Sequence, residues 1–142
     1  MKWEYIFSTI IGVITMLIGG WSLALQILLV LMCVDIISGI IKSLKNNSYS
    51  SRQFRQGLFV KSGFFAVLIL CYQVDLLLSN GVPVIRNICV LFYIAIEGSS
   101  IIENLGAMGV PIPTILVKKF QVLKEQAEQE SVKQESKDNL NK

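Results

Sequence analysis

Residues 23–41, which read LALQILLVLMCVDIISGII, decide the fold class of this chain. The stretch is nineteen residues long, and its only charged side chain is that of Asp35. An α-helix needs about twenty predominantly apolar residues to cross the hydrocarbon core of a bilayer. We therefore predict that this stretch is a transmembrane helix and that the chain is an integral membrane protein.

The apolar sequence continues toward the amino terminus. Between Ile6 and Ile41, which are 36 residues, Asp35 is still the only charged residue. One helix of that length would be roughly 54 Å long, against a hydrocarbon core of about 30 Å. Gly19-Gly20 interrupts the run, so we predict a short first span over residues 5–18 ahead of the span at 23–41.

Two further apolar stretches follow, at residues 62–79 and at about 84–104, and the turn sequence NGVP separates them at residues 80–83. The prediction is an all-α membrane domain over residues 1–112 with about four transmembrane helices. The alternative is three, with the first segment in the membrane interface. The residues that break the last helix of this domain are Gly109, Pro111 and Pro113.

The remaining chain changes in character. Within residues 113–123, Leu116, Phe120 and Leu123 share one helical face with lysines beside it, which predicts a short amphipathic helix on the cytoplasmic membrane surface. Residues 124–142 consist mostly of Lys, Glu, Gln, Ser and Asn. Such a composition buries too little apolar surface to offset its ordering entropy, so we expect a disordered, charged cytoplasmic tail.

Basic residues set the predicted topology. The segment between the second and third spans carries no acidic residue and five basic ones, which are Lys42, Lys45, Arg52, Arg55 and Lys61. Short loops rich in Lys and Arg stay in the cytoplasm. With four spans, both termini are then cytoplasmic, whereas with three spans the amino terminus lies outside.

The composition argues against several classes of function. There is no histidine, and the three cysteines each lie inside an apolar run, so we expect no metal site and no cofactor. A net charge of +3 is too small to indicate nucleic-acid binding. Asp35 and Asp75, on neighbouring predicted spans, lie toward opposite membrane faces and cannot share a proton as in an aspartyl protease. We therefore predict that the chain is not an enzyme.

Polar side chains inside the predicted spans are the candidate functional residues. A charge at the bilayer centre is unfavourable by about 2.5–3.5 kcal/mol. The polar side chains of the fourth span form a stripe along one helical face, and this stripe fits two interpretations. Its residues are Tyr93, Glu97, Ser100 and Asn104. It is either a polar seam that joins helices inside a bundle or a water-exposed pore surface in an assembly. The candidates are Asp35, Ser38, Asp75, Tyr93, Glu97, Ser100 and Asn104.

Four motifs carry a family resemblance. The most distinctive is EGSSIIEN at residues 97–104, which leads into GVPIP at 109–113. The others are VDIISGI at 34–40, the linker with Ser50-Ser51, Gly57 and Lys61, and Asp75 near the end of the third span. Over roughly residues 23–123 the chain resembles the toxin-secretion and phage-lysis holins, which include the clostridial toxin-release holins. It departs from the family pattern at Ile96, where an asparagine is frequent, and at Val60, where a basic residue is frequent.

The resemblance implies a small prophage or toxin-locus protein of the bacterial cytoplasmic membrane. Such proteins form homo-oligomers in the lipid bilayer and open lesions or pores through which an endolysin or a large toxin leaves the cell. An antiholin is a further partner of some members. The resemblance leaves open the oligomer number, the lesion size, the cargo and the timing.

Two other classes of function are compatible with the sequence. One is a small four-helix proton-coupled exporter, in which Glu97 would be the membrane carboxylate that binds substrate and proton. The long basic linker and the charged tail count against it, because transport needs neither. The other is an accessory subunit of a membrane complex.

Overall fold

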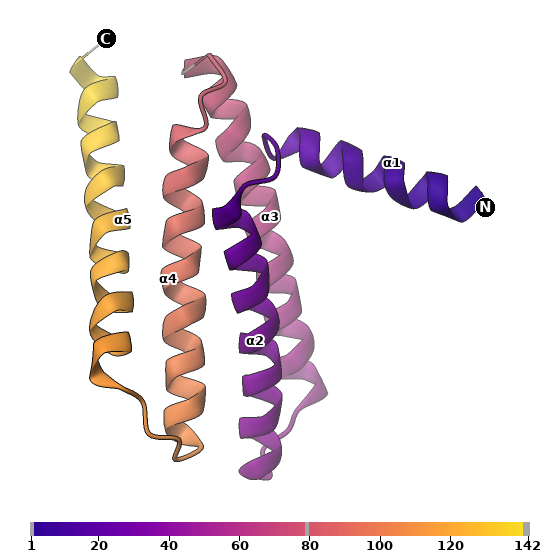
Figure 1. The fold of residues 1–142 in the computed structure, drawn as a ribbon, viewed down its shortest axis with the longest axis vertical. Coiled ribbons are helices and arrows are strands. Elements are labelled where there is room, and N and C mark those ends of the chain that lie inside the picture. Colours follow the sequence, from indigo (N-terminus) through magenta and orange to yellow (C-terminus); the bar gives the residue numbers. More distant parts are fainter. Residues whose placement is uncertain (1, 79, 141–142) are drawn as a thin grey trace.

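The computed structural model describes residues 2–78 and 80–140, and every regular element in these residues is an α-helix. Four helices run side by side, and α1 projects away from the end of the bundle where α2 begins (Figure 1). The prediction of an all-α fold is confirmed. The helices are α1 (Lys2–Leu17), α2 (Leu23–Lys45), α3 (Ser51–Leu78), α4 (Val84–Ala107) and α5 (Thr114–Leu140).

Three of these helices, α2, α3 and α4, are long and apolar enough to cross a membrane, within the residues described. They have 23, 28 and 24 residues and correspond to the three later predicted spans, of which residue 79 lies outside the described part. The first predicted span corresponds to α1, which has only 16 residues and leaves the bundle sideways (Figure 1). The structure therefore does not confirm a fourth crossing.

The third long helix begins earlier than the sequence predicted. Residues 42–61 were expected to form a linker, but α2 continues to Lys45 and α3 starts at Ser51, so the connection is only residues 46–50. No proline interrupts residues 51–78, and the Ser50 hydroxyl lies 3.5 Å from the amide of Gln53 at the start of the helix. As a result the basic residues of the expected linker lie on helices.

The central helix of the bundle is α4, which packs against α2, α3 and α5. Leu25 and Leu28 of α2, Leu68 of α3 and Val90 of α4 are almost fully buried and form the middle of the apolar core. On the α3 side, the rings of Phe64 and Tyr93 stack with their centroids 4.0 Å apart. Because the other long helices contact α4, its position fixes theirs.

The direction of α1 is fixed by the turn that follows it. Gly19 has a φ of +79°, and the ring of Tyr72 lies so close that a Cβ at Gly19 would overlap it. Arg86 is 3% exposed and its guanidinium donates to the carbonyl oxygens of Ile18 at 2.8 Å and Gly19 at 2.9 Å. The carbonyl groups of the turn after α1 are thereby satisfied by a side chain of α4.

At the carboxyl end the structure does not confirm the expected disorder. Helix α5 extends from Thr114 to Leu140, beyond the short helix predicted over 113–123, and it runs back along α4 (Figure 1). No Gly or Pro interrupts residues 114–140, and Glu, Gln and Lys are good helix formers. Phe120 also packs against Gly98, a tertiary contact that composition does not reveal. Residues 141 and 142 of the predicted tail lie outside the described part.

Two of the three cysteines meet between α3 and α4. The sulfur atoms of Cys71 and Cys89 lie 3.1 Å apart, while Cys33 is exposed on α2. Although all three cysteines lie in apolar stretches of sequence, only Cys71 is buried, while Cys89 is half-buried.

This pair provides a test of the packing of α3 on α4. A disulfide needs the two sulfur atoms to approach by only about 1 Å. Treatment of membranes with copper–phenanthroline should therefore join Cys71 and Cys89 within one chain, and Cys33 should remain free for a maleimide label. Mass spectrometry of unreduced peptides measures the bond, and Cys71→Ala is the control that should abolish it. Recovery of both cysteines unlinked in the wild type would contradict this packing.

Candidate functional site

Glu97, in the middle of α4, is 2% exposed and has a specific partner. Its carboxylate accepts a hydrogen bond from the ammonium group of Lys61 on α3. The same ammonium nitrogen lies 3.0 Å from the carboxylate of Asp35 on α2. One lysine thus holds two carboxylates from two other helices.

The hydrogen bonds continue from Asp35 toward the loop at 46–50. Asn104 of α4 donates from Nδ2 to Asp35 at 3.1 Å and to the hydroxyl of Ser38 at 3.2 Å. Lys42 of α2 donates to Oδ1 of Asn104 at 2.6 Å. We call these side chains the three-helix network: Asp35, Ser38, Lys42, Lys61, Glu97 and Asn104.

Helical spacing explains how the three-helix network is assembled. On α2, Asp35, Ser38 and Lys42 are three, four and seven residues apart and face the same way. On α4, Glu97 and Asn104 are seven residues apart and also share a face. The network lies in the half of the bundle nearest the 46–50 loop, on the loop side of the apolar core.

The charges in this network balance. Two carboxylates are matched by two ammonium groups, and no buried side-chain nitrogen or oxygen in the described residues lacks a hydrogen-bond partner. A balanced network lowers the unfavourable free energy of placing charge at membrane depth. Removal of one partner leaves an uncompensated buried charge, which typically destabilises a protein by about 3–5 kcal/mol.

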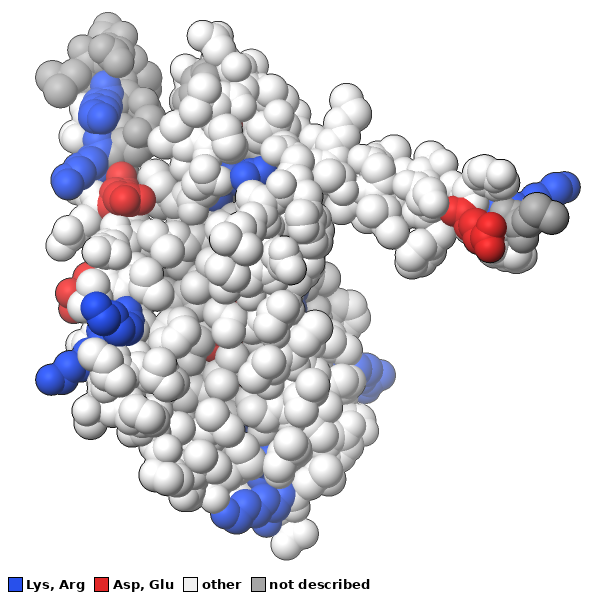
Figure 2. Space-filling view, viewed as in Figure 1, with Lys and Arg blue, Asp and Glu red and all other residues white. Residues whose placement is uncertain are grey.

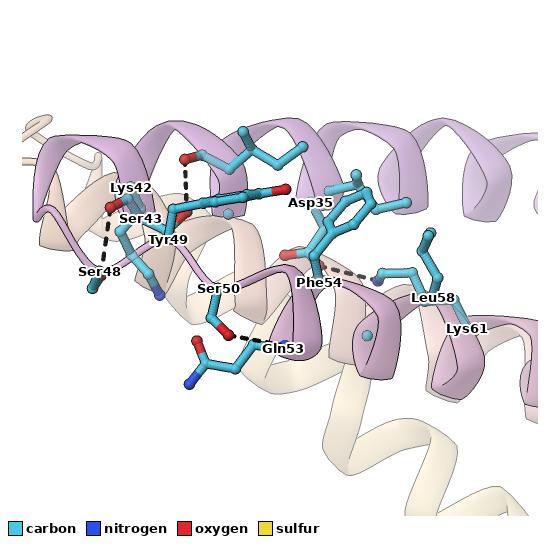
Figure 3. A pocket seen from close by; sticks show the side chains of 14 residues that line it. Asp35, Lys42, Ser43, Ser48, Tyr49, Ser50, Gln53, Phe54, Leu58 and Lys61 are labelled. Atoms are coloured by element: carbon cyan, nitrogen blue, oxygen red, sulfur yellow. Dashed lines mark hydrogen bonds and ion pairs between the residues drawn. The ribbon is translucent and has the colours of Figure 1, made fainter.

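A cavity of 270 Å³ between α2 and α3 reaches the network from the loop side. Figure 3 shows Asp35 and Lys61 at one part of this cavity, with Tyr49 and Phe54 reaching between the two helices. Ser43, Ser48 and Ser50 line it near the loop. Among the described residues, α2 and α3 have no extensive backbone contact with each other, so water can approach the Asp35–Lys61 pair from this side.

Asp75 belongs to a different site. It is fully buried and its two carboxylate oxygens accept from the backbone amides of Ile85 at 2.8 Å and Arg86 at 2.9 Å. Pro83, at the start of α4, supplies no side-chain cap. Asp75 therefore satisfies the first amide groups of α4 and joins α3 to it at the end remote from the network.

The other candidate residues have more local contacts. Tyr93 stacks on Phe64, and Ser100 is half-buried without a hydrogen bond to the network in the described structure. Lys45 donates to the carbonyl oxygen of Met108 after α4, while Arg52 and Arg55 are exposed on α3. Gly109 has a φ of +81° in the turn after α4, and Pro111 and Pro113 precede α5.

Sequence reasoning missed the role of two basic residues. Lys61 was assigned to the linker, for its topology and its family motif, but not to a carboxylate partner, and Arg86 was not among the candidate residues. The available signal was the position of Lys61 at the edge of the third apolar stretch. The neighbouring predicted spans contain Asp35 and Glu97, two carboxylates that need a partner at membrane depth. The described residues contain no group of three or more His, Cys, Asp or Glu side chains placed to hold a metal ion.

The first test of the network concerns Lys61. Lys61→Met leaves Asp35 and Glu97 buried without their shared cation and should lower the free energy of unfolding by about 3–5 kcal/mol. Denaturant unfolding of the purified protein in detergent measures the change. Arg55→Met, on the exposed side of the same helix, is the matched control and should stay within about 0.5 kcal/mol of the wild type.

A compensated variant separates charge from packing. Adding Asp35→Asn and Glu97→Gln to Lys61→Met removes every charge from the ion pairs and should recover much of the lost stability. Equal stability of Lys61→Met and Arg55→Met would show that the ion pairs do not hold the bundle together.

Comparison with known proteins identifies the family. Residues 12–125 match the bacteriophage holin family. A probable holin of Bacillus phage phi105 is 38% identical over 110 residues, covering 77% of this chain and 80% of that protein. The uncharacterized protein YqxH of Bacillus subtilis is 39% identical over 119 residues, covering 83% and 79%, and an uncharacterized protein of Clostridium perfringens is 37% identical over 102 residues, covering 72% and 76%. No solved structure matches the chain. The chain belongs to the bacteriophage holin family.

Proposed function

We propose that this protein is a holin that assembles from several copies in the bacterial cytoplasmic membrane and opens lesions through which an endolysin or a large toxin leaves the cell. Membership of the holin family and three helices of membrane-crossing length support the proposal. The observation that carries it is the three-helix network. It places ionised groups from three spanning helices where lipid would otherwise surround them.

The network suggests how one chain tolerates these charges before assembly. In a single copy, Lys61 pairs with Glu97 and Asp35, and Lys42 adds the second positive charge of the network through Asn104, so the helices remain together at membrane depth. When copies assemble around water, the same groups are stabilised by hydration and no longer need one another. The network thus combines the two interpretations of the polar stripe: it is a helix-joining seam in one copy and a source of water-exposed charge in the assembly.

For the topology we propose three spans with the 46–50 loop and the carboxyl terminus in the cytoplasm. Five basic residues flank that loop, which supports its cytoplasmic location. Helix α1 then lies in the outer interface, with the amino terminus outside. The contacts of Arg86 and Tyr72 with the turn after α1 favour this arrangement, because a fourth crossing would have to rebuild that turn.

The position of the amino terminus is a direct test of this topology. An epitope tag placed before Lys2 should be cleaved by protease added to intact protoplasts, because three spans put it outside. A tag after Lys142 is the control and should be cleaved only after the membrane is opened. If the amino-terminal tag is also protected in intact protoplasts, the chain has the four spans predicted from the sequence.

The function itself is tested by induced expression together with an endolysin that lacks a signal peptide. Culture turbidity should fall abruptly after a delay, and the fall should require both proteins. A proton-coupled exporter would instead raise drug resistance without releasing the endolysin. Continued growth, with the protein present in the membrane fraction, would contradict a holin function.

Variants of Glu97 link this function to the network. Glu97→Gln keeps a hydrogen-bond acceptor for Lys61 but removes the charge, so it should change the time of lysis. Glu97→Leu should impair lysis more, because Lys61 then retains only Asp35. Ser100→Ala is a matched control on the same helix and should lyse on the wild-type schedule. If both Glu97 variants also do so at equal membrane levels, the network is an ordinary packing seam.

A further inference from the structure

Helix α5 covers a specific face of α4. The ring of Phe120 lies against Gly98 so closely that a Cβ at Gly98 would overlap it. Leu91 and Ile94 of α4 line a hollow together with Glu130 and Lys133 of α5. We call Leu91, Ile94 and Gly98 the Gly98 face of α4; none of its side chains is charged.

The cover is chemically unlike the helix that it covers. Of the 27 residues of α5, five are lysines and five are acidic. Lys118, Lys119 and Lys124 are exposed while α5 rests on α4, and Figure 2 shows charged side chains along α5 beside a bundle face that is mostly uncharged between a few basic patches. If α4 crosses the bilayer, α5 cannot remain beside it without exposing these charges to lipid.

Helix α5 has another place to lie. Its first turns carry Leu116, Phe120 and Leu123 on one face with lysines beside them, a pattern suited to an anionic membrane surface. Moving there removes Phe120 from Gly98 and leaves the Gly98 face without its cover. A glycine on a spanning helix allows the backbone of another helix to approach closely, and α5 itself demonstrates that a helix fits on this face.

We propose, building on the holin function above, that α5 is a detachable cover and that the Gly98 face of α4 binds α4 of a second copy when α5 moves to the membrane surface. A second α4 is apolar where α5 is charged, so it is the occupant that the bilayer permits. Phe120 and the second copy compete for the same face. A weaker α5 contact therefore favours association.

Cysteine cross-linking in membranes tests this proposal on the full chain. In a background of Cys33→Ser, Cys71→Ala and Cys89→Ala, Leu91→Cys places one thiol on the Gly98 face. Phe92→Cys is the matched control, at the same depth and about 100° around the helix. After oxidation with copper–phenanthroline, Leu91→Cys should give several-fold more disulfide-linked dimer than Phe92→Cys on an unreduced gel.

The cover is tested by adding Phe120→Ala to Leu91→Cys. This change should raise the dimer yield and advance lysis, whereas Val117→Ala, an exposed apolar residue on the same helix, should do neither. Equal cross-linking at positions 91 and 92 overturns the proposed face, and an unchanged or lower dimer yield with Phe120→Ala overturns the cover. Failure of every variant and the wild type to lyse cells would instead contradict the holin function, whatever the cross-linking pattern.

Discussion

The packing of α2, α3 and α4 centres on Lys61 of α3, which contacts carboxylates of both α2 and α4. In a bilayer, helices gain little from hiding apolar surface from one another, because lipid is as apolar as they are. Close packing and polar contacts must then hold them together. Since α2 and α3 each pack on α4, the Lys61–Asp35 pair also links the two helices that are otherwise separated by the cavity.

At the opposite end of the bundle, charged side chains bind uncharged groups of the backbone. Asp75 binds the first amides of α4, and Arg86 binds carbonyl groups of the turn after α1. Asp75 and Arg86 are 0% and 3% exposed, whereas the side chains of Asp35 and Lys61 in the network are 13% exposed and lie beside a cavity. The two ends therefore differ in how readily water can compete with their contacts, and the network end is the more accessible.

Hydropathy was sufficient to predict the three long helices, because each contains a predominantly apolar stretch of membrane-crossing length. It could not predict the partner of Glu97, because that partner depends on the relative register of α3 and α4. Lys61 was hidden for a further reason: five of the first six residues of α3 are polar, so the start of this helix resembled a linker. The helix at the carboxyl end was missed because composition argued for disorder, whereas helix propensity and the Phe120–Gly98 contact favour order.

The motif EGSSIIEN at residues 97–104 contributes to two surfaces of α4, one facing the three-helix network and one facing α5. Glu97 and Asn104 face the network, while Gly98, one residue from Glu97 and about 100° around the helix, faces α5. Glu97 and Gly98 are adjacent in one helical turn, so a rotation of α4 that separates Glu97 from Lys61 also moves Gly98 relative to Phe120. In the proposed assembly, the release of the network charges and the exchange of the α5 cover would therefore be linked through this single turn of α4.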